Sequence, residues 1–369
     1  MKDLKKKIIK KIHAIGFDVV GFTKPNVDEI TKKKYLEFLN KNQHGEMRWL
    51  ERHYEKKIDP KKMWNKVKTV VVIGHNYTPK DNPLKLNNFD NLANISVYAQ
   101  NEDYHDVIKK KLDKLQCWLL NDKGVESKIF VDSSPVLEKY FAQKSNIGWQ
   151  GKHTNIVSKK YGSWLFLSEI FLPIKIETKD IFEDSCGSCN QCREICPTNA
   201  LSNSYSIDAR KCISYLTIEY KGPIPLSLRK KIGNKVYGCD DCLSICPWNK
   251  FASESDEKKY KSIGKNMDLE FYLKFDEQKF NLFFQNSPIK RIGWTRFLRN
   301  IIIASGNSNN KNLFGHIFKH FNNQSSIIRG ICIWAIFQLV DENIKNKLKK
   351  QILSFEKNKY VLYELKMAS

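Results

Sequence analysis

Eight of the ten cysteines fall within one stretch of the chain, and this stretch limits the possible fold more than any other feature. The first run, "CGSCNQCREICP", has the spacing C-x2-C-x2-C-x3-C-P, which is that of bacterial ferredoxins. In such a run the first three thiolates hold one [4Fe–4S] cluster, and the fourth ligates a different cluster. The run therefore predicts a second cluster that needs three further thiolates.

A second run, "CDDCLSICP", follows at 239–247 with one cysteine fewer. By the same logic, its last cysteine completes the first cluster and its first two join the second cluster. Cys212, in "RKCISYL", supplies the ligand that is still missing. The first predicted ligand set is Cys186, Cys189, Cys192 and Cys246. The second predicted ligand set is Cys196, Cys212, Cys239 and Cys242.

The main alternative is zinc held by pairs of CxxC motifs. Zinc does not explain three evenly spaced cysteines or the two Cys-Pro endings, so we favour two [4Fe–4S] clusters. The two remaining cysteines, Cys117 and Cys332, lie in apolar helical patterns, and we expect both in the core.

The chain is strongly basic, with 63 Lys and Arg against 40 Asp and Glu in 369 residues and a formal charge of +23. Such an excess favours a polyanionic partner, nucleic acid first and an anionic membrane surface second. The alternative is a lysine-rich composition with solvated lysines on helix surfaces. We expect a cytoplasmic protein, because the first residues lack an apolar export segment and no apolar run reaches membrane-spanning length. Cysteines in that reducing compartment favour metal ligation over disulfides.

Three parts follow one another along the chain. The first mixes strands and helices: "VKTVVVIGHNY" (67–77) predicts a buried strand, 103–120 an amphipathic helix, and "TNIVSKKYGSWLFLSEIFL" a hairpin that turns at Lys159–Gly162. The cysteine-rich part comes next, and a polar connector follows it from about residue 253. The last part is helical, and from 281 to 369 it carries 14 Lys and Arg against 4 Asp and Glu.

Asp132 is the candidate reactive group outside the cysteines. It ends a predicted strand at a polar turn in "FVDSSPVLEKYF", which is a usual place for a reactive carboxylate. The alternative is an N-cap for the helix that begins near Pro135, and the sequence leaves both open. Glu138 is expected on the surface of that helix. No G-x-G-x-x-G or P-loop is found, and His105 lacks the glycine that accompanies a cobalt-binding histidine in D-x-H-x-x-G, since Ile108 stands there.

Several segments together resemble the epoxyqueuosine reductase family: "VDSSPVLEKYFAQKSNIGWQGKHTNIVS", the two cysteine runs, "RKCISYLTIE" and "SPIKRIGWTRFLRNIIIASGN". The resemblance implies an α+β fold in three domains: a nitroreductase-like cobalamin-binding domain over 1–175, a ferredoxin-like domain with two [4Fe–4S] clusters over 176–255, and a HEAT-like α-helical domain over 256–369. It implies reduction of epoxyqueuosine to queuosine at the wobble position of tRNA, by a monomer that needs a low-potential electron donor.

The resemblance also implies roles for individual residues. Asp132 matches the proposed proton donor and would lie at the cobalamin. The other residues implied near the corrin are Lys57, Lys152, Ile156, Ser214, Asp240 and Asp241. The candidates for tRNA phosphate contacts are Lys221, Arg291, Arg296, Arg299 and Arg329. For each arginine a solvated helix face is the alternative, and the rival functions are a corrinoid reductive dehalogenase and a ferredoxin-like electron carrier.

Overall fold

The computed structural model describes residues 2–132, 134–178 and 183–367. Two compact units emerge, and each is assembled from three stretches of chain. The first unit comprises Met1–Asp81, Glu102–Arg210 and Asp241–Lys261, and the second comprises Asn82–Asn101, Lys211–Asp240 and Ser262–Ser369. The units are assemblies in space, whereas the three expected domains are ranges along the chain, so that division stays a prediction.

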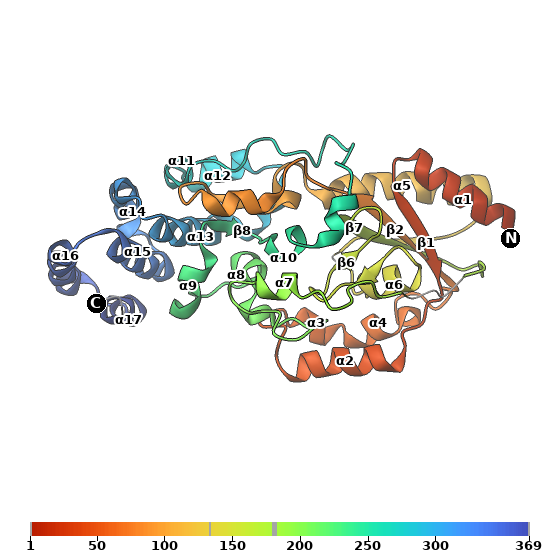
Figure 1. Ribbon diagram of the computed structural model, residues 1–369, viewed down its shortest axis with the longest axis horizontal. Helices are drawn as coiled ribbons and strands as arrows, with labels where there is room; N and C mark the ends of the chain where they lie inside the picture. Colours follow the sequence, from red (N-terminus) through yellow and green to blue (C-terminus); the bar gives the residue numbers. More distant parts are fainter. Residues whose placement is uncertain (1, 133, 179–182, 368–369) are drawn as a thin grey trace. The chain divides into compact units, whose positions relative to one another are not determined.

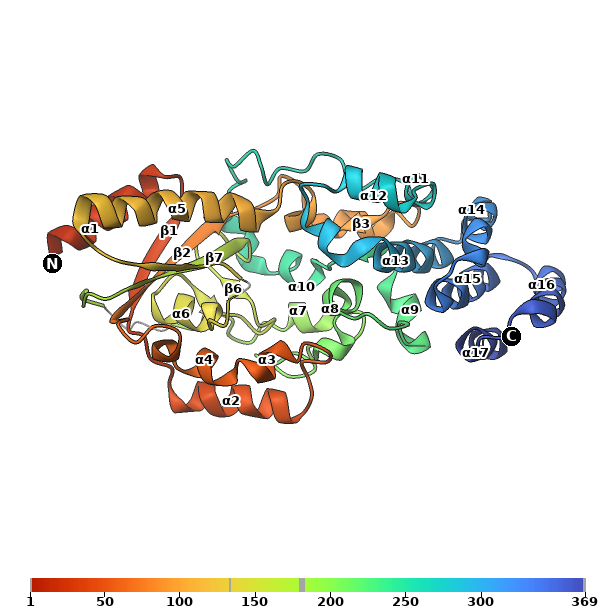
Figure 2. The ribbon, with the colours of Figure 1, turned by 180° about the vertical axis from the view of Figure 1, so that it is seen from behind.

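An antiparallel four-stranded sheet organises the first unit, in the order β1-β2-β7-β4. Its strands are β1 (Val19–Thr23), β2 (Thr69–Asn76), β7 (Leu165–Leu172) and β4 (Lys128–Phe130). Figures 1 and 2 show α1 (Lys2–Ala14) and α5 (Tyr104–Lys123) over one face of this sheet and α6 (Glu138–Lys144) over the other. Because both faces are covered, all eight residues of β2 are buried.

The predicted strand at 67–77 and the predicted helix at 103–120 are confirmed as β2 and α5. Helix α5 begins after Asp103, whose carboxylate accepts a hydrogen bond from the backbone N–H of His105 at 3.0 Å. It ends at Gly124, whose φ of 62° places it in the left-handed region that favours glycine. These two caps fix which side chains stand in the first turn of α5.

The predicted hairpin is wrong in its pairing. Ser158 and Gly162 do exchange backbone hydrogen bonds at the turn, at 2.7 and 3.0 Å. Beyond the turn the two runs part, because β7 already has β2 on one edge and β4 on the other. The earlier run, β6 (Ile156–Val157), pairs instead with β5 (Trp149–Gln150).

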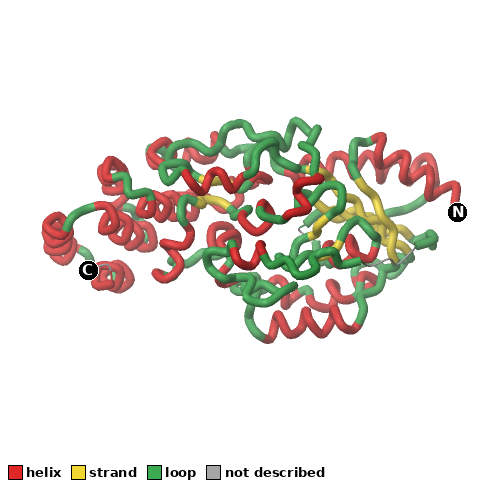
Figure 3. Tube along the Cα trace, in the orientation of Figure 1, coloured by secondary structure: helices red, strands yellow, loops and turns green. Residues whose placement is uncertain are grey.

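Helices dominate the second unit, where α13 (Gly293–Asn307), α15 (Ser326–Leu339) and α17 (Lys359–Met367) pack in succession. Figure 3 shows the short helices and loops between them. The helical character predicted for the last part of the chain is confirmed, and a buried ion pair holds Arg229 to Glu364 at 2.7 and 2.5 Å. A short parallel pair joins β3 (Asn94–Ile95) to β8 (Lys235–Tyr237).

The remaining helices are short, and none of the described helices is long and apolar enough to cross a bilayer. Those of the first unit are α2 (Glu29–Asn40), α3 (Trp49–Arg52), α4 (Tyr54–Ile58), α7 (Gln191–Glu194) and α10 (Asp241–Ser244). Those of the second unit are α8 (Ile213–Ile218), α9 (Leu226–Ile232), α11 (Leu269–Leu273), α12 (Glu277–Phe283), α14 (Phe314–Phe318) and α16 (Glu342–Phe355).

The two cysteines outside the clustered region have different environments. Cys332 is fully buried in α15, as predicted. Cys117 is exposed, so its predicted core position is wrong. The buried face of α5 includes Leu115 and Leu119, and Cys117, halfway between them in sequence, points to the opposite side of the helix.

Candidate active site

Four cysteines line one cavity of about 80 Å³ in the first unit: Cys186, Cys189, Cys192 and Cys246. They are the four that the spacing assigns to the first cluster. The run from Cys186 to Cys189 forms a turn, with a backbone hydrogen bond of 3.1 Å between them and a φ of 51° at Gly187. Local turns thus bring three thiols together, while Cys246 reaches the cavity from the residues after α10.

The four cysteines that line this cavity have the ligand type and number that a [4Fe–4S] cluster takes. A [4Fe–4S] cluster needs thiols that surround a volume, because the four thiolates bind it as a group. Supporting donors are also in place: the indole N–H of Trp149 donates to Cys186 Sγ at 3.3 Å.

Lys152 is part of the frame around this cavity. The residue is 8% exposed, and its ammonium group donates to the backbone oxygens of Gly187 at 2.7 Å and Cys189 at 2.9 Å. A positive charge beside four thiolates offsets part of their negative charge. The structure therefore places Lys152 at the cysteine loop, and its predicted corrin contact stays a prediction.

The other four cysteines are divided between the units. Cys196 and Cys242 belong to the first unit, and Cys212 and Cys239 to the second. Cys196 Sγ already accepts a hydrogen bond from the backbone N–H of Ala200 at 3.3 Å. The second ligand set stays a prediction from spacing.

Asp132 lies two residues after β4, and its backbone has a φ of 46°, in the left-handed region that Asp tolerates better than most residues. Its side chain is 54% exposed and accepts hydrogen bonds from the Tyr104 hydroxyl and from His105 Nε2, the latter at 3.1 Å. Its backbone N–H donates to Glu138 Oε1 at 2.7 Å. The N-cap alternative is wrong, because α6 begins only at Glu138 and has no side-chain cap.

Both ring nitrogens of His105 face carboxylates, Nδ1 toward Asp103 at 2.7 Å and Nε2 toward Asp132. Burial disfavours the charged imidazolium, but these two hydrogen bonds and the carboxylate charges outweigh it and raise the pKa of His105 to about 9. Partial burial likewise disfavours an ionised Asp132, yet the hydrogen bonds from His105 and Tyr104 lower the pKa of its carboxyl. The proton shared by this pair therefore resides on His105.

Sequence reasoning missed Tyr104, and it considered His105 only as a cobalt ligand. The "DYH" segment contains a usable signal, since the Asp103 N-cap places both residues in the first turn of α5. That this turn faces the end of β4 is a matter of tertiary packing, which the sequence does not display.

Two further carboxyl groups stand beside Asp132. Glu138, expected on the helix surface, is half-buried, and its Oε1 accepts the hydrogen bond from the Asp132 backbone. Glu169 lies on β7, opposite Phe130 of β4, and is 0% exposed. Burial and then the charge of Asp132 raise the pKa of Glu138 to about 8, and burial with the charges of Glu138 and Asp132 raises that of Glu169 well above its ordinary value. We call Asp132, Glu138 and Glu169 the carboxyl cluster.

Lys57 is a buried cation beside the carboxyl cluster. It is 7% exposed, and its ammonium lies 3.4 Å from the backbone oxygen of Val136. Burial lowers the pKa of Lys57, although the charges of Glu138 and Asp132 oppose this shift. Lys57 and Asp132 are thus the two predicted cobalamin residues that the first unit brings together.

The remaining predicted cobalamin residues lie in other surroundings. Ile156 is buried in the core with Tyr140 and Phe141. Asp240 is buried and accepts hydrogen bonds from the Ser96 hydroxyl and, at 2.8 Å, from the backbone N–H of Val97. Asp241 is buried at the start of α10, and Ser214 is half-buried on α8. The fit to a corrin therefore rests on Asp132 and Lys57.

The arginines proposed for tRNA separate into two groups. Arg299 is 1% exposed and donates to the backbone oxygens of Leu216, Tyr220 and Gly222, so its predicted phosphate contact is wrong. Arg296 donates to Ile218 O at 2.7 Å, and Arg329 forms a two-point ion pair with Glu356 at 2.7 and 3.2 Å. These two are committed to structural contacts, whereas Lys221 and Arg291 are exposed.

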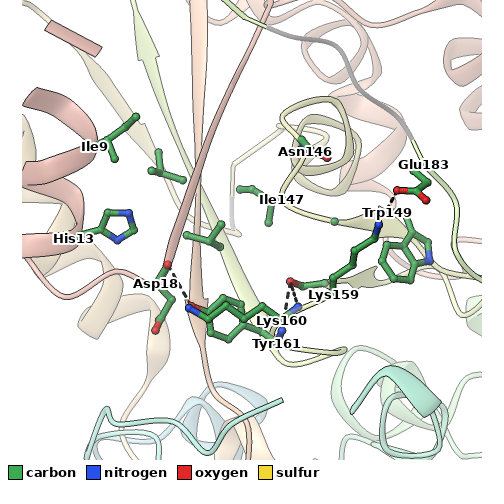
Figure 4. A pocket seen from close by; sticks show the side chains of 14 residues that line it. Ile9, His13, Asp18, Asn146, Ile147, Trp149, Lys159, Lys160, Tyr161 and Glu183 are labelled. Carbon is green, nitrogen blue, oxygen red and sulfur yellow. Dashed lines mark hydrogen bonds and ion pairs between the residues drawn. The ribbon is translucent and has the colours of Figure 1, made fainter. Parts of the chain in front are cut away.

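A larger, open pocket of about 570 Å³ lies elsewhere in the first unit (Figure 4). His13 of α1, Asp18 and Lys160 line it, and Lys159 pairs with Glu183 at its rim at 2.7 Å. Trp149 lines it as well, so the residue that donates to Cys186 also borders this pocket.

Comparison with known protein families yields two matches. Residues 57–133 match the model described as "Epoxyqueuosine reductase QueG, DUF1730", and residues 185–249 match the "4Fe-4S double cluster binding domain". The second match establishes a region for two clusters, and all eight clustered cysteines lie within it.

Relatives and solved structures agree. The epoxyqueuosine reductase of Vibrio cholerae is 40% identical over 299 residues, with 80% of each chain covered, and that of Escherichia coli is 38% identical over 305 residues, with 80% of this chain and 78% of the relative covered. A crystal structure of epoxyqueuosine reductase with a tRNA-Tyr epoxyqueuosine-modified tRNA stem loop has a TM-score of 0.91 at 27% identity, covering 100% of this chain and 98% of the other. The chain therefore belongs to the epoxyqueuosine reductase family.

Proposed function

We propose that this chain reduces epoxyqueuosine to queuosine in tRNA, with Asp132 as the residue that hands protons to the substrate. Family membership supports the reaction, and a structurally similar epoxyqueuosine reductase has been solved with a modified tRNA stem loop. The observation that carries the Asp132 role is its position: a half-exposed carboxylate held by Tyr104 and by a protonated His105. A structurally similar enzyme from Bacillus subtilis, with a TM-score of 0.90, has a catalytic aspartate loop that is swung out of the active site.

Conversion of an epoxide to an alkene consumes two electrons and two protons and releases one water molecule. The proton on His105 Nε2 is 3.1 Å from Asp132 Oδ2, so it can move to the exposed carboxyl and from there to the departing oxygen. Tyr104 and the Glu138 contact hold the carboxylate and its backbone in place during this transfer. His105 and Asp132 thus form a pair, which we call the His105–Asp132 proton couple, in which His105 holds the proton and the exposed Asp132 passes it to the substrate.

The electrons require groups that the chain binds. Cobalamin would supply a strongly reducing cobalt centre when bound, and Lys57 and Asp132 are the residues of the first unit that would face it. The cavity of Cys186, Cys189, Cys192 and Cys246 would hold one [4Fe–4S] cluster, with Trp149 and Lys152 as supporting donors. The other cluster would be held by Cys196, Cys212, Cys239 and Cys242. An external low-potential electron donor would reduce both clusters.

The exposed cations are proposed to contact the phosphates of tRNA. Lys221 and Arg291 present their side chains to solvent, and the chain's net charge of +23 favours a polyanion. Arg296 and Arg329 would join only by giving up their present partners, so we assign them a minor part.

The test is conversion of epoxyqueuosine in tRNA under anaerobic conditions by protein reconstituted with iron, sulfide and cobalamin. The expected product is queuosine, read by mass spectrometry of tRNA digests. Cobalamin uptake without conversion, accompanied by halide release from a halogenated phenol, would favour the reductive dehalogenase instead. Clusters that reduce normally in a protein that takes up no cobalamin would favour a simple electron carrier.

A further inference from the structure

Glu169 is a fully buried carboxyl group for which the described residues provide no hydrogen-bond donor. Among the described residues, neither of its side-chain oxygens has a partner, and it lies in the middle of β7, within the central sheet. An isolated carboxylate in such a place would strongly destabilise the folded state, so the group is expected to be neutral, with a proton bound.

Its neighbours explain how it is accommodated. The nearest acidic groups are Glu138 on α6 and Asp132 after β4, and both act on Glu169 by charge. Ionised carboxylates only accept hydrogen bonds, so Glu169 and Glu138 can bond to each other only if one of them keeps a proton. Two carboxyls that share a proton in a buried site are a known way to hold an acid neutral near physiological pH.

The charged groups around this pair come from helices α4, α5 and α6. Lys57 of α4 lies on one side, Lys139 of α6 is close, and His105 of α5 reaches Asp132. The cations are too few and too distant to give Glu169 a donor, and burial dominates, raising its pKa well above the ordinary value. Burial without a donor among the described residues and the neighbouring negative charges both favour a proton on this pair.

The stoichiometry of the reaction gives that proton a use. Epoxide reduction needs two protons per turnover, and the His105–Asp132 couple stores one. We propose that Glu138 and Glu169 form a proton reservoir that holds the second proton and passes it from Glu169 through Glu138 to Asp132 after the first has been spent. The inference rests on the proposed function, and it makes Glu138 and Glu169 positioning residues that act through Asp132. Each turnover then moves one proton from His105 and one from the reservoir onto the departing oxygen, which leaves as water.

Glu169→Gln tests the reservoir, because the amide can still donate to Glu138 but has no proton to transfer. We expect the single-turnover rate of tRNA conversion to fall by about 10²-fold and its decline at alkaline pH, which follows deprotonation of the reservoir in the wild type, to disappear. Infrared spectra of the wild type should contain the carbonyl stretch of a buried carboxylic acid that persists at neutral pH, and Glu169→Gln should lose the component of that band that Glu169 contributes.

Glu126→Gln is the matched control, because Glu126 is exposed and pairs with Lys66 on the surface. It should leave both the rate and the infrared band unchanged. A Glu169→Gln enzyme with the wild-type rate and pH profile, or a wild type without the acid band, would overturn the reservoir. If Glu169→Gln does not fold, Glu138→Gln provides the same two readouts. The infrared band is measured without substrate, so the reservoir and the proposed function can fail separately. If only the proposed function is wrong, the wild type keeps the acid band but converts no tRNA.

Discussion

The cysteine cavity and the carboxyl cluster lie in the same unit, yet they are assembled in opposite ways. Three of the four cavity thiols come from one short run, shaped by a local turn at Gly187. The three carboxyls come from a loop after β4, from α6 and from the centre of β7. The first site follows almost entirely from the spacing of residues in the sequence. The second site forms only when the sheet and its covering helices pack together.

The difference also extends to charge. The cavity is provided with donors, since Trp149 and Lys152 both direct hydrogens at the cysteine loop. Glu169 has been left without one. A thiolate site needs compensation for the negative charge that it must keep, whereas an acid reservoir works only if ionisation is disfavoured. The predictions below test whether the two sites can be disrupted independently.

Removal of a cavity thiol should have the largest effect. Cys246→Ala takes away the one ligand that comes from outside the first run, and we expect loss of one cluster and complete loss of tRNA conversion. Iron content and the visible spectrum of purified protein provide the measurement. Cys117→Ala is the control, because Cys117 is exposed and distant in sequence from both runs. A full complement of iron in Cys246→Ala would contradict the ligand set.

Asp132→Asn should leave the cysteine cavity intact and affect the chemistry alone. The amide keeps the size of the side chain but cannot carry a proton from His105, so we expect turnover to fall by about 10² to 10⁴-fold with an unchanged cluster spectrum. The measurement is the single-turnover rate in anaerobic tRNA conversion. Asp113→Asn, on the exposed side of α5, should retain the wild-type rate. Wild-type turnover by Asp132→Asn would remove Asp132 from the proton path.

The contrast also explains what the sequence could predict. The first cluster's ligands, β2, α5 and the helical last part follow from spacing and periodicity, which are properties of neighbours in the chain. The hairpin failed because β7 took β4 as its second neighbour, a choice made by the whole sheet. Arg299 read as a surface cation, yet its guanidinium is used by three backbone oxygens from another part of the second unit. Glu169 gave no signal at all, since an acid in "LFLSEIFL" looks like the polar face of a strand.

Lys152→Met should weaken the frame of the cavity without removing a ligand. The methionine fills similar space but leaves the backbone oxygens of Gly187 and Cys189 without their donor, at a cost of about 2 kcal/mol. We expect a lower thermal midpoint and faster loss of the cluster spectrum in air. Lys159→Met, which removes an exposed pair with Glu183, should change stability by less than about 0.5 kcal/mol. Equal behaviour of the two variants would mean that the Lys152 contacts do not support the cysteine loop.

The smallest effect concerns stability rather than activity, and its sign depends on pH. The folded pKa of Glu169 lies above the unfolded value of about 4.3. Between these two pKa values Glu169 is protonated in the folded state and ionised in the unfolded state, so the wild type loses stability as the pH rises from the lower value to the higher. Glutamine does not titrate, so the free energy of unfolding of Glu169→Gln should rise relative to that of the wild type. We expect a rise on the order of 1 kcal/mol for each pH unit above about pH 5. Urea unfolding at several pH values measures the difference. A gap that does not change with pH would mean that Glu169 is ionised in the folded protein, and the reservoir would then have no proton to give.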